Sequence, residues 1–252
     1  MNTTWLNSRS VRAAITLAAV LAIGLCQPGQ AEASFVMRLT NVETATVVTI
    51  TDGGAGDLQP LIAGHILFSG AVGNFTLNVD TGLSKPLIGN SPTFAHMDLS
   101  SQNVTSLSGG TLIIELTDTS FPAFTEPSGV LYAAVGGTNG GTSAFDAWKS
   151  TTNQEFAANG LHIELPPVGT FGPGAFSDSD FLFHGPLPTF SMTLVATIVH
   201  SGPATSSFNF EVINATPDRI PGLPEPASMV IWSLGAGAIG LAGFWRRKRA
   251  AV

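Results

Sequence analysis

Strict alternation of apolar and polar residues runs through the middle of the chain. Between residues 74 and 80, Phe75, Leu77 and Val79 alternate with polar residues. The same period of two recurs at 190–198 and 208–212. Because successive side chains of a strand point to opposite faces, these segments predict strands with one face on a core. Further segments with strand patterns are 35–40, 45–51, 62–69, 93–99, 111–117, 130–135, 161–165 and 181–184.

Gly-rich turn clusters separate the expected strands. They are Asp52-Gly53-Gly54, Gly109-Gly110, Gly136-Gly137, Asn139-Gly140-Gly141, Gly172-Pro173-Gly174 and Ser201-Gly202-Pro203. No long amphipathic helix is expected, since 143–150 and 152–159 are short helices at most. Many short strands with such turns predict an all-β fold, an antiparallel β-sandwich or a jelly-roll-like ectodomain over residues 34–213.

The N-terminus has the features of a secretory signal peptide, predicted over residues 1–33. Basic residues precede an apolar run at 13–26, which is too short for an ordinary transmembrane helix. Ala31 and Ala33 then place small residues at the spacing of a cleavage site. We therefore expect signal peptidase to cleave before Ser34.

Cys26 leaves a second interpretation of this end open, that of a lipoprotein signal. Leu25 is bulky where such signals prefer a small residue, which favours the first interpretation. Cleavage after Ala33 would remove Cys26, the chain's one cysteine. A mature chain without cysteine excludes a disulfide scaffold, a cysteine-based zinc site and a thiol redox enzyme.

Three features follow one another at the C-terminus. A Pro-Glu-Pro triplet precedes an apolar run at 227–245 and a basic cluster at 246–249. At 1.5 Å per residue the run makes about 28 Å of helix, close to the hydrocarbon thickness of a bilayer, so we expect a transmembrane helix. The basic residues that predict a cytoplasmic end are Arg246, Arg247, Lys248 and Arg249.

This tail, over about residues 222–252, resembles the PEP-CTERM sorting signal of Gram-negative and related bacteria. In that family an exosortase, a membrane protease-transpeptidase, recognises the triplet. The resemblance implies that residues 224–252 are a sorting signal and that 214–223 are a spacer. The implied recognition residues, in the role of a substrate, are Pro224, Glu225 and Pro226. Leu223 stands where the usual pattern has Val.

The segment 49–121 also resembles the ectodomain of PEP-CTERM proteins that have no established activity. Together the resemblances imply a non-enzymatic exported protein that is anchored transiently in the inner membrane, with its C-terminus in the cytoplasm. Cleavage near the triplet would then send the ectodomain to the cell surface or the extracellular matrix. Sorting in the tail's family commonly accompanies exopolysaccharide production, so a biofilm role and an extracellular polysaccharide partner are implied.

The composition narrows the choice of partners. The formal net charge is -7, and charged residues make up only 11% of the chain. Most of the basic residues lie in the predicted signal peptide and the C-terminal tail, so the ectodomain itself is strongly acidic. Because phosphate backbones need basic surfaces, we do not expect nucleic-acid binding.

Two acidic pairs raise the question of a metal site. Asp52 and Asp57 bracket a Gly-rich loop that could wrap Ca²⁺, although the spacing is not that of an EF-hand. Asp178 and Asp180 raise the same question. An acidic turn is the plain alternative for both pairs. The five histidines form no metal-binding motif, so no other cofactor is expected.

Two further functions stay open beside the surface protein. One is a surface binding module for glycan, Ca²⁺ or ice, although aromatic platforms are scarce and no T-x-T ladder suggests ice binding. The other is a secreted hydrolase. Because no G-x-S-x-G elbow is present to hold a serine nucleophile, such an enzyme would use paired carboxylates. Its candidate carboxylates are Glu115, Asp118, Glu126, Glu155 and Glu164.

Overall fold

The computed structural model describes residues 34–220. Four predicted features lie outside the described residues and remain predictions. They are the signal peptide, the Pro-Glu-Pro triplet, the transmembrane helix and the basic cluster. Within 34–220, no helix has the length and apolar character needed to cross a membrane.

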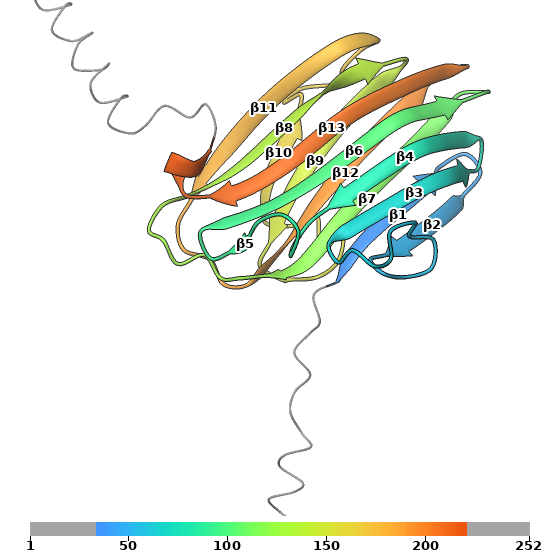
Figure 1. Ribbon diagram of the computed structural model, residues 1–252. Helices are drawn as coiled ribbons and strands as arrows, with labels where there is room; N and C mark the ends of the chain where they lie inside the picture. The colour runs from blue at the N-terminus through green and yellow to red at the C-terminus, as the bar shows by residue number, and fades with distance from the viewer. Residues whose placement is uncertain (1–33, 221–252) are drawn as a thin grey trace, which may run out of the picture. The chain divides into compact units, whose positions relative to one another are not determined.

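Two antiparallel sheets pack face to face as a β-sandwich (Figure 1), which confirms the all-β prediction. Sheet A has the strand order β10-β9-β12-β7-β1-β2. Its strands are β1 (Phe35–Asn41), β2 (Thr46–Thr51), β7 (Gly110–Phe121), β9 (Thr142–Ser150), β10 (Leu161–Leu165) and β12 (Phe190–His200).

Sheet B has the order β11-β8-β13-β6-β4-β3, and the short β5 pairs with β6. Its strands are β3 (His65–Val72), β4 (Phe75–Leu83), β5 (Asn90–Ser91), β6 (Phe94–Ser106), β8 (Gly129–Asn139), β11 (Gly174–His184) and β13 (Ala204–Ala215). A 3₁₀ turn, η1 (Pro217–Arg219), follows β13.

The sheets are interleaved along the chain. Seven connections between consecutive strands cross from one sheet to the other: β2–β3, β6–β7, β7–β8, β8–β9, β10–β11, β11–β12 and β12–β13. As a result, the late strand β12 lies between β9 and β7, and β13 lies between β8 and β6. The centre of each sheet is therefore completed by the C-terminal part of the domain (Figure 1).

The predicted alternation produces the core between the sheets. The apolar side chains of β12 that were expected to face inward are all at most 1% exposed, and they are Phe190, Met192, Leu194, Ala196 and Ile198. Phe75 and Leu77 of β4 are fully buried as well, whereas the side chain of Val79 is outside what the structure describes. The core-facing side chains of these strands are buried, as a sandwich requires, and Ser191 and Thr193 on the other face of β12 are buried too.

Three expectations about secondary structure were wrong. Residues 143–150 form most of strand β9 instead of a short helix, because their alternation places Phe145 and Ala147 in the core. Gly136 and Gly137 lie inside β8 rather than in a turn. The domain also continues past residue 213, since β13 reaches Ala215 and Ile220 is only 4% exposed.

Both ends of the described domain lie at the same end of the strands. Phe35, where β1 begins, pairs with Asp118 close to the end of β7. The first residue of β12, Phe190, pairs with Phe121 at that same end. Since β13 runs back antiparallel after the short turn that follows β12, its last residue, Ala215, returns to this end (Figure 1).

Candidate functional site

The two aspartates proposed for Ca²⁺ brace the loop between β2 and β3. Asp57 is 7% exposed and accepts three backbone hydrogen bonds. Its donors are the N–H groups of Gly53, Gln59 and Leu67, at 3.0, 2.9 and 3.1 Å. Asp52 accepts from Gly64 N–H at 2.7 Å, while its Oδ1 is buried and has no hydrogen-bond partner. Because N–H groups already point at three of the four oxygens, this arrangement fits a loop brace better than a calcium ligand set.

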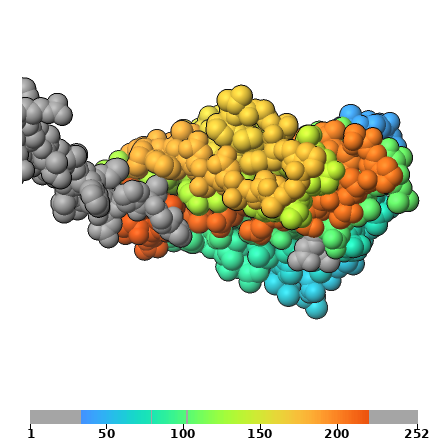
Figure 2. All heavy atoms as spheres, turned by 90° about the horizontal axis from the view of Figure 1, so that it is seen from above, coloured from blue at the N-terminus to red at the C-terminus, as the bar shows by residue number. Residues whose placement is uncertain are grey.

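The other acidic pair does not join the first one. Asp178 and Asp180 lie on β11, at one edge of sheet B, whereas Asp52 and Asp57 adjoin β2 and β3 at the opposite edge of the sandwich. The β11 flank faces the viewer in Figure 2, in yellow. Among residues 34–220, no group of three or more His, Cys, Asp and Glu side chains could hold a metal.

The structure also separates the carboxylates considered for a hydrolase. Glu115 is bound to Arg38, and Asp118 is bound to the buried Lys85. Glu155 accepts a hydrogen bond from the hydroxyl of Ser34. Glu126 lies in the loop after β7, and Glu164 is exposed on β10. Glu115 and Asp118 therefore belong to two separate ion pairs.

A different pair of carboxylates meets on the outer face of sheet B. Asp98 of β6 lies directly opposite Glu211 of β13 in the strand register. Their neighbours along the strands, Met97 and Val212, point into the core, so both carboxylates point outward. Side chains directly opposite on antiparallel strands have Cβ atoms about 5 Å apart, which brings the two carboxylates into mutual contact range.

Neighbouring side chains hold this pair in place. His96 Nε2 lies 3.1 Å from Glu211 Oε2. Burial is the main cause that raises the pKa of Asp98, and the charge of Glu211 raises it further. A hydrogen bond from Asn209 and the nearby His96 act in the opposite direction. Asp98, an acid whose pKa is raised, therefore lies beside a second carboxylate that contacts His96.

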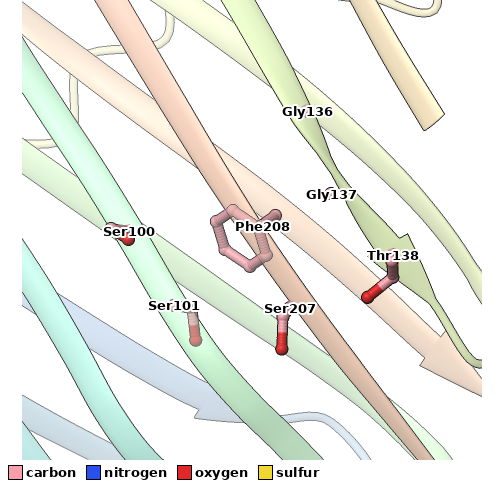
Figure 3. Close-up of a pocket in the computed structure, with 7 residues that line it drawn as sticks. All are labelled: Ser100, Ser101, Gly136, Gly137, Thr138, Ser207 and Phe208. Carbon is pink, nitrogen blue, oxygen red and sulfur yellow. The ribbon is translucent and has the colours of Figure 1, made fainter. Parts of the chain in front are cut away.

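Figure 3 shows a shallow depression of about 400 Å³. It begins at Ser100, two residues along β6 from Asp98. Its lining residues come from β6, β8 and β13 and are Ser100, Ser101, Gly136, Gly137, Thr138, Ser207 and Phe208. Two glycines in β8 leave this part of the sheet without side chains. A Cβ on Gly137 would lie 2.2 Å from the Ser207 carbonyl oxygen, so only glycine fits there. A Cβ placed on Gly136 would make ordinary contacts, with the Phe176 carbonyl oxygen at 3.8 Å and the Ser177 Cβ at 3.9 Å.

The depression and the carboxylates together offer hydroxyl donors and acceptors, one amide and two acids on a flat strand surface. Such groups can bind a ligand rich in hydroxyls through many hydrogen bonds. The single Trp and Tyr of the domain do not line the depression: Trp148 stacks on His162 at 3.7 Å between ring centroids, on sheet A. Binding here would therefore depend on polar groups rather than on aromatic stacking.

A second polar cluster, at the opposite end of the strands from Phe35, is buried. His200 is 2% exposed, and its Nδ1 and Nε2 lie 2.8 Å from the hydroxyls of Ser106 and Ser206. The hydroxyl of Ser206 in turn donates to Asn139 Oδ1 at 2.8 Å. Burial lowers the pKa of His200, so the imidazole is neutral. The cluster resembles a nucleophile and its base, but its burial assigns it to bonding the two sheets together.

Sequence patterns alone did not single out the carboxylate pair. His96, Asp98 and Ser100 alternate with core residues in the sequence. This alternation predicts that they lie on a strand and point away from the core. Their proximity to Glu211 depends on the pairing of β6 with β13, which lie more than 100 residues apart in the chain. Prediction of the depression would also have required the knowledge that Gly136 and Gly137 lie in a strand.

Comparisons with known proteins add little to this geometry. No protein-family model matches the sequence, and no curated protein matches it. Among solved structures, the enzymatically active domain of tailspike protein 4 from bacteriophage CBA120 is similar over 65% of this chain, with 15% identity and a TM-score of 0.29. The chain spans 21% of that protein's length.

Proposed function

We propose that this chain is an exported, non-enzymatic bacterial surface or matrix protein that is sorted by an exosortase through its C-terminal tail. The main observation in support is that the folded domain begins and ends close to the two expected processing sites. Strand β1 begins at Phe35, directly after the residue that cleavage at Ala33 would leave first. The backbone nitrogen of that residue, Ser34, donates to Thr119 Oγ1 at 2.9 Å, and an amino terminus could make the same bond.

The other end of the domain supports the same proposal. Turn η1 ends at Arg219, a few residues before the Pro-Glu-Pro triplet, and Ile220 still packs against the domain. Cleavage at the triplet would thus leave all thirteen strands intact. A matrix protein that is released or transferred by such processing needs a domain that stays folded after both cleavages.

Replacing Glu225 by alanine is expected to stop tail processing. The wild-type protein should appear in the surface or medium fraction, with the mass of a chain that has lost both the signal peptide and the C-terminal tail. The Glu225→Ala variant should accumulate in the inner membrane with its tail. Asp218→Ala is the matched control, because Asp218 is an exposed acid nearby in the chain but outside the triplet. Cell fractionation with intact mass measurement tests this.

A wild-type protein that retains its tail in the inner membrane would contradict the sorting proposal. So would a Glu225→Ala variant that is processed as fast as the Asp218→Ala control. In either case the sandwich would be a tethered domain, and the search for its partner would move to the periplasm.

A second candidate function is glycan binding by the outer face of sheet B. The observation that favours it is the depression beside Asp98 and Glu211, which is lined mainly by hydroxyl groups and glycine. Extracellular polysaccharide is the hydroxyl-rich ligand that a matrix protein would meet. This candidate depends on the face alone, so it holds whether or not the tail is cleaved.

Filling the depression is expected to weaken polysaccharide binding at least tenfold. Gly136→Leu adds a side chain whose Cβ would meet its nearest neighbour at 3.8 Å, an ordinary contact, so the fold should tolerate it. Gly172→Leu is the matched control, because a Cβ there meets nothing within 4 Å and Gly172 is outside the depression. Titration calorimetry with exopolysaccharide from the source bacterium measures the affinities. Absence of binding by the wild-type protein, or equal loss in both variants, would reject this site.

A further inference from the structure

A buried lysine lies between the two sheets without an acidic partner. Lys149 of β9 is 2% exposed, and none of the ion pairs found among residues 34–220 includes it. Its Nζ donates instead to Oδ1 of Asn214 on β13, which is 1% exposed. The Nζ atom also lies 4.2 Å from the centre of the Phe190 ring. A lysine held this way is unusual, since a buried ammonium group normally has a paired charge.

His184 completes the cluster. Its Nε2 lies 2.7 Å from Asn214 Oδ1 and 3.3 Å from Lys149 Nζ. The Phe124 ring packs edge-on against the imidazole, at 5.1 Å between centroids. Gly129 makes this packing feasible, because a Cβ there would lie 2.3 Å from the imidazole and 2.6 Å from the Phe124 ring. Three polar side chains from three strands thus converge in a pocket of aromatic rings.

Burial favours the uncharged forms of this cluster. It lowers the pKa of Lys149 to about 7, and burial together with the charge of Lys149 lowers the pKa of His184. A substantial share of Lys149 is therefore the neutral amine at neutral pH. The two ring nitrogens of His184 lie 2.7 Å from carbonyl oxygens, those of Gly185 and Asn214, and with its proton on Nε2 the imidazole donates to Asn214 Oδ1.

We propose that Lys149 and Asn214 form an intramolecular amide cross-link between sheet A and sheet B, with His184 as the catalytic acid. The reactants are a neutral amine and a carboxamide that are already in contact. The carbonyl carbon of Asn214 is one bond beyond the oxygen that Lys149 Nζ contacts. Contact of this kind replaces an improbable encounter with an intramolecular step.

The reaction balances without any co-reactant. Nζ of Lys149 attacks Cγ of Asn214, and His184 Nε2–H donates to Oδ1 as negative charge develops there. The extra proton on Nζ passes to Nδ2 of Asn214. The Cγ–Nδ2 bond then breaks, ammonia leaves, and the carbonyl re-forms with the new Nζ–Cγ amide bond. Neither oxidation nor reduction takes place.

The domain's other buried lysine is a useful contrast. Lys85 Nζ lies 2.6 Å from Asp118 Oδ1, so its charge is compensated by a carboxylate. The second oxygen of Asp118 accepts from the Ser84 hydroxyl at 2.5 Å, and no histidine takes part. That pair is a salt bridge in which the amine remains a cation, and we do not expect a cross-link there.

Peptide mapping of the full-length chain as isolated, after denaturation, tests the cross-link. Cleavage after glutamate separates Lys149 from Asn214, because Glu155, Glu164 and Glu211 lie between them. We expect a branched peptide that joins the two residues and is lighter than the sum of its parts by one ammonia. Recovery of Lys149 only as the free amine, from protein that unfolds cooperatively on heating, would overturn the proposal.

Variants assign the role of each group. Lys149→Met should abolish the branched peptide, and His184→Gln should slow its formation by about 10²–10⁴-fold, the usual contribution of a general acid. His162→Gln is the matched control, because that histidine bonds to Asp146 on the outside of sheet A and should leave the cross-link intact. A His184→Gln protein that is cross-linked as completely as the control at the earliest time point would overturn the catalytic role of His184.

Discussion

Replacing Asp118 by alanine is expected to destabilise the sandwich by about 3–5 kcal/mol, the usual cost of stranding one member of a buried ion pair. The side chains of Lys85 and Asp118 are 7% and 1% exposed. Besides Asp118, the ammonium of Lys85 contacts the Thr119 carbonyl and the face of Phe121, at 4.3 Å from the ring centre. Without the carboxylate, neither contact offsets the cost of burying a cation. Urea denaturation at neutral pH measures the change.

Two variants separate charge burial from a general loss of packing. Glu115 lies on β7, as Asp118 does, and Glu115→Ala breaks its ion pair with Arg38 of β1. Because the Glu115 and Arg38 side chains are 16% and 35% exposed, a loss of about 1 kcal/mol or less is expected. The double variant Lys85→Met with Asp118→Leu removes both charges and should recover most of the stability that Asp118→Ala loses. Equal effects of Asp118→Ala and Glu115→Ala would contradict the argument.

The strands of this fold were largely predictable because period two depends only on local sequence. Strand β10 has the predicted bounds, 161–165, and the five apolar side chains expected to face inward from β12 are buried, although Ser191 and Thr193 on its other face are buried as well. The failures share a physical cause. Residues 143–150 did not stand out as a strand because the inward positions of β9 include Ser143 and Lys149, which a hydrophobic pattern assigns to the surface.

Glycine was the second source of error. Gly136 and Gly137 are typical turn residues, yet in β8 they allow the backbone of β13 to approach closely and leave the outer face hollow. The sequence cannot distinguish a glycine that bends the chain from one that makes room for a neighbour, because the neighbour is set by strand pairing. The same limit hid Asp98 with Glu211, and Lys149 with Asn214, since each pair joins strands that are distant in the chain.

The aspartates of the β2–β3 loop illustrate how one local motif is compatible with two roles. A Gly-rich loop with two carboxylates supplies the right oxygen atoms for Ca²⁺. The same flexibility lets the loop turn its N–H groups toward Asp57, which therefore stabilises the turn itself. Residue types alone could not decide between these outcomes, because both need acids and glycines at similar spacing.

Replacing Asp80 by asparagine is expected to stabilise the protein at alkaline pH by on the order of 2–4 kcal/mol. Asp80 is fully buried, its Oδ2 has no hydrogen-bond partner, and only the Ser101 hydroxyl donates to its Oδ1. Burial therefore raises the pKa of Asp80 to about 7. At pH 9 the wild-type protein must bury a carboxylate, whereas asparagine stays neutral and keeps the shape of the protonated acid.

The sign of the pH dependence follows from this raised pKa. The folded protein binds the proton of Asp80 more tightly than the unfolded chain, whose pKa is near 3.8. Its stabilising contribution is thus complete below pH 4 and is lost as the pH rises through about 7. Unfolding free energies between pH 4 and 9 should show this decline in the wild type and in the exposed control Asp180→Asn, but not in Asp80→Asn. A decline of equal size in all three proteins would mean that Asp80 does not titrate in this range, and that another buried acid such as Asp118 dominates the pH response.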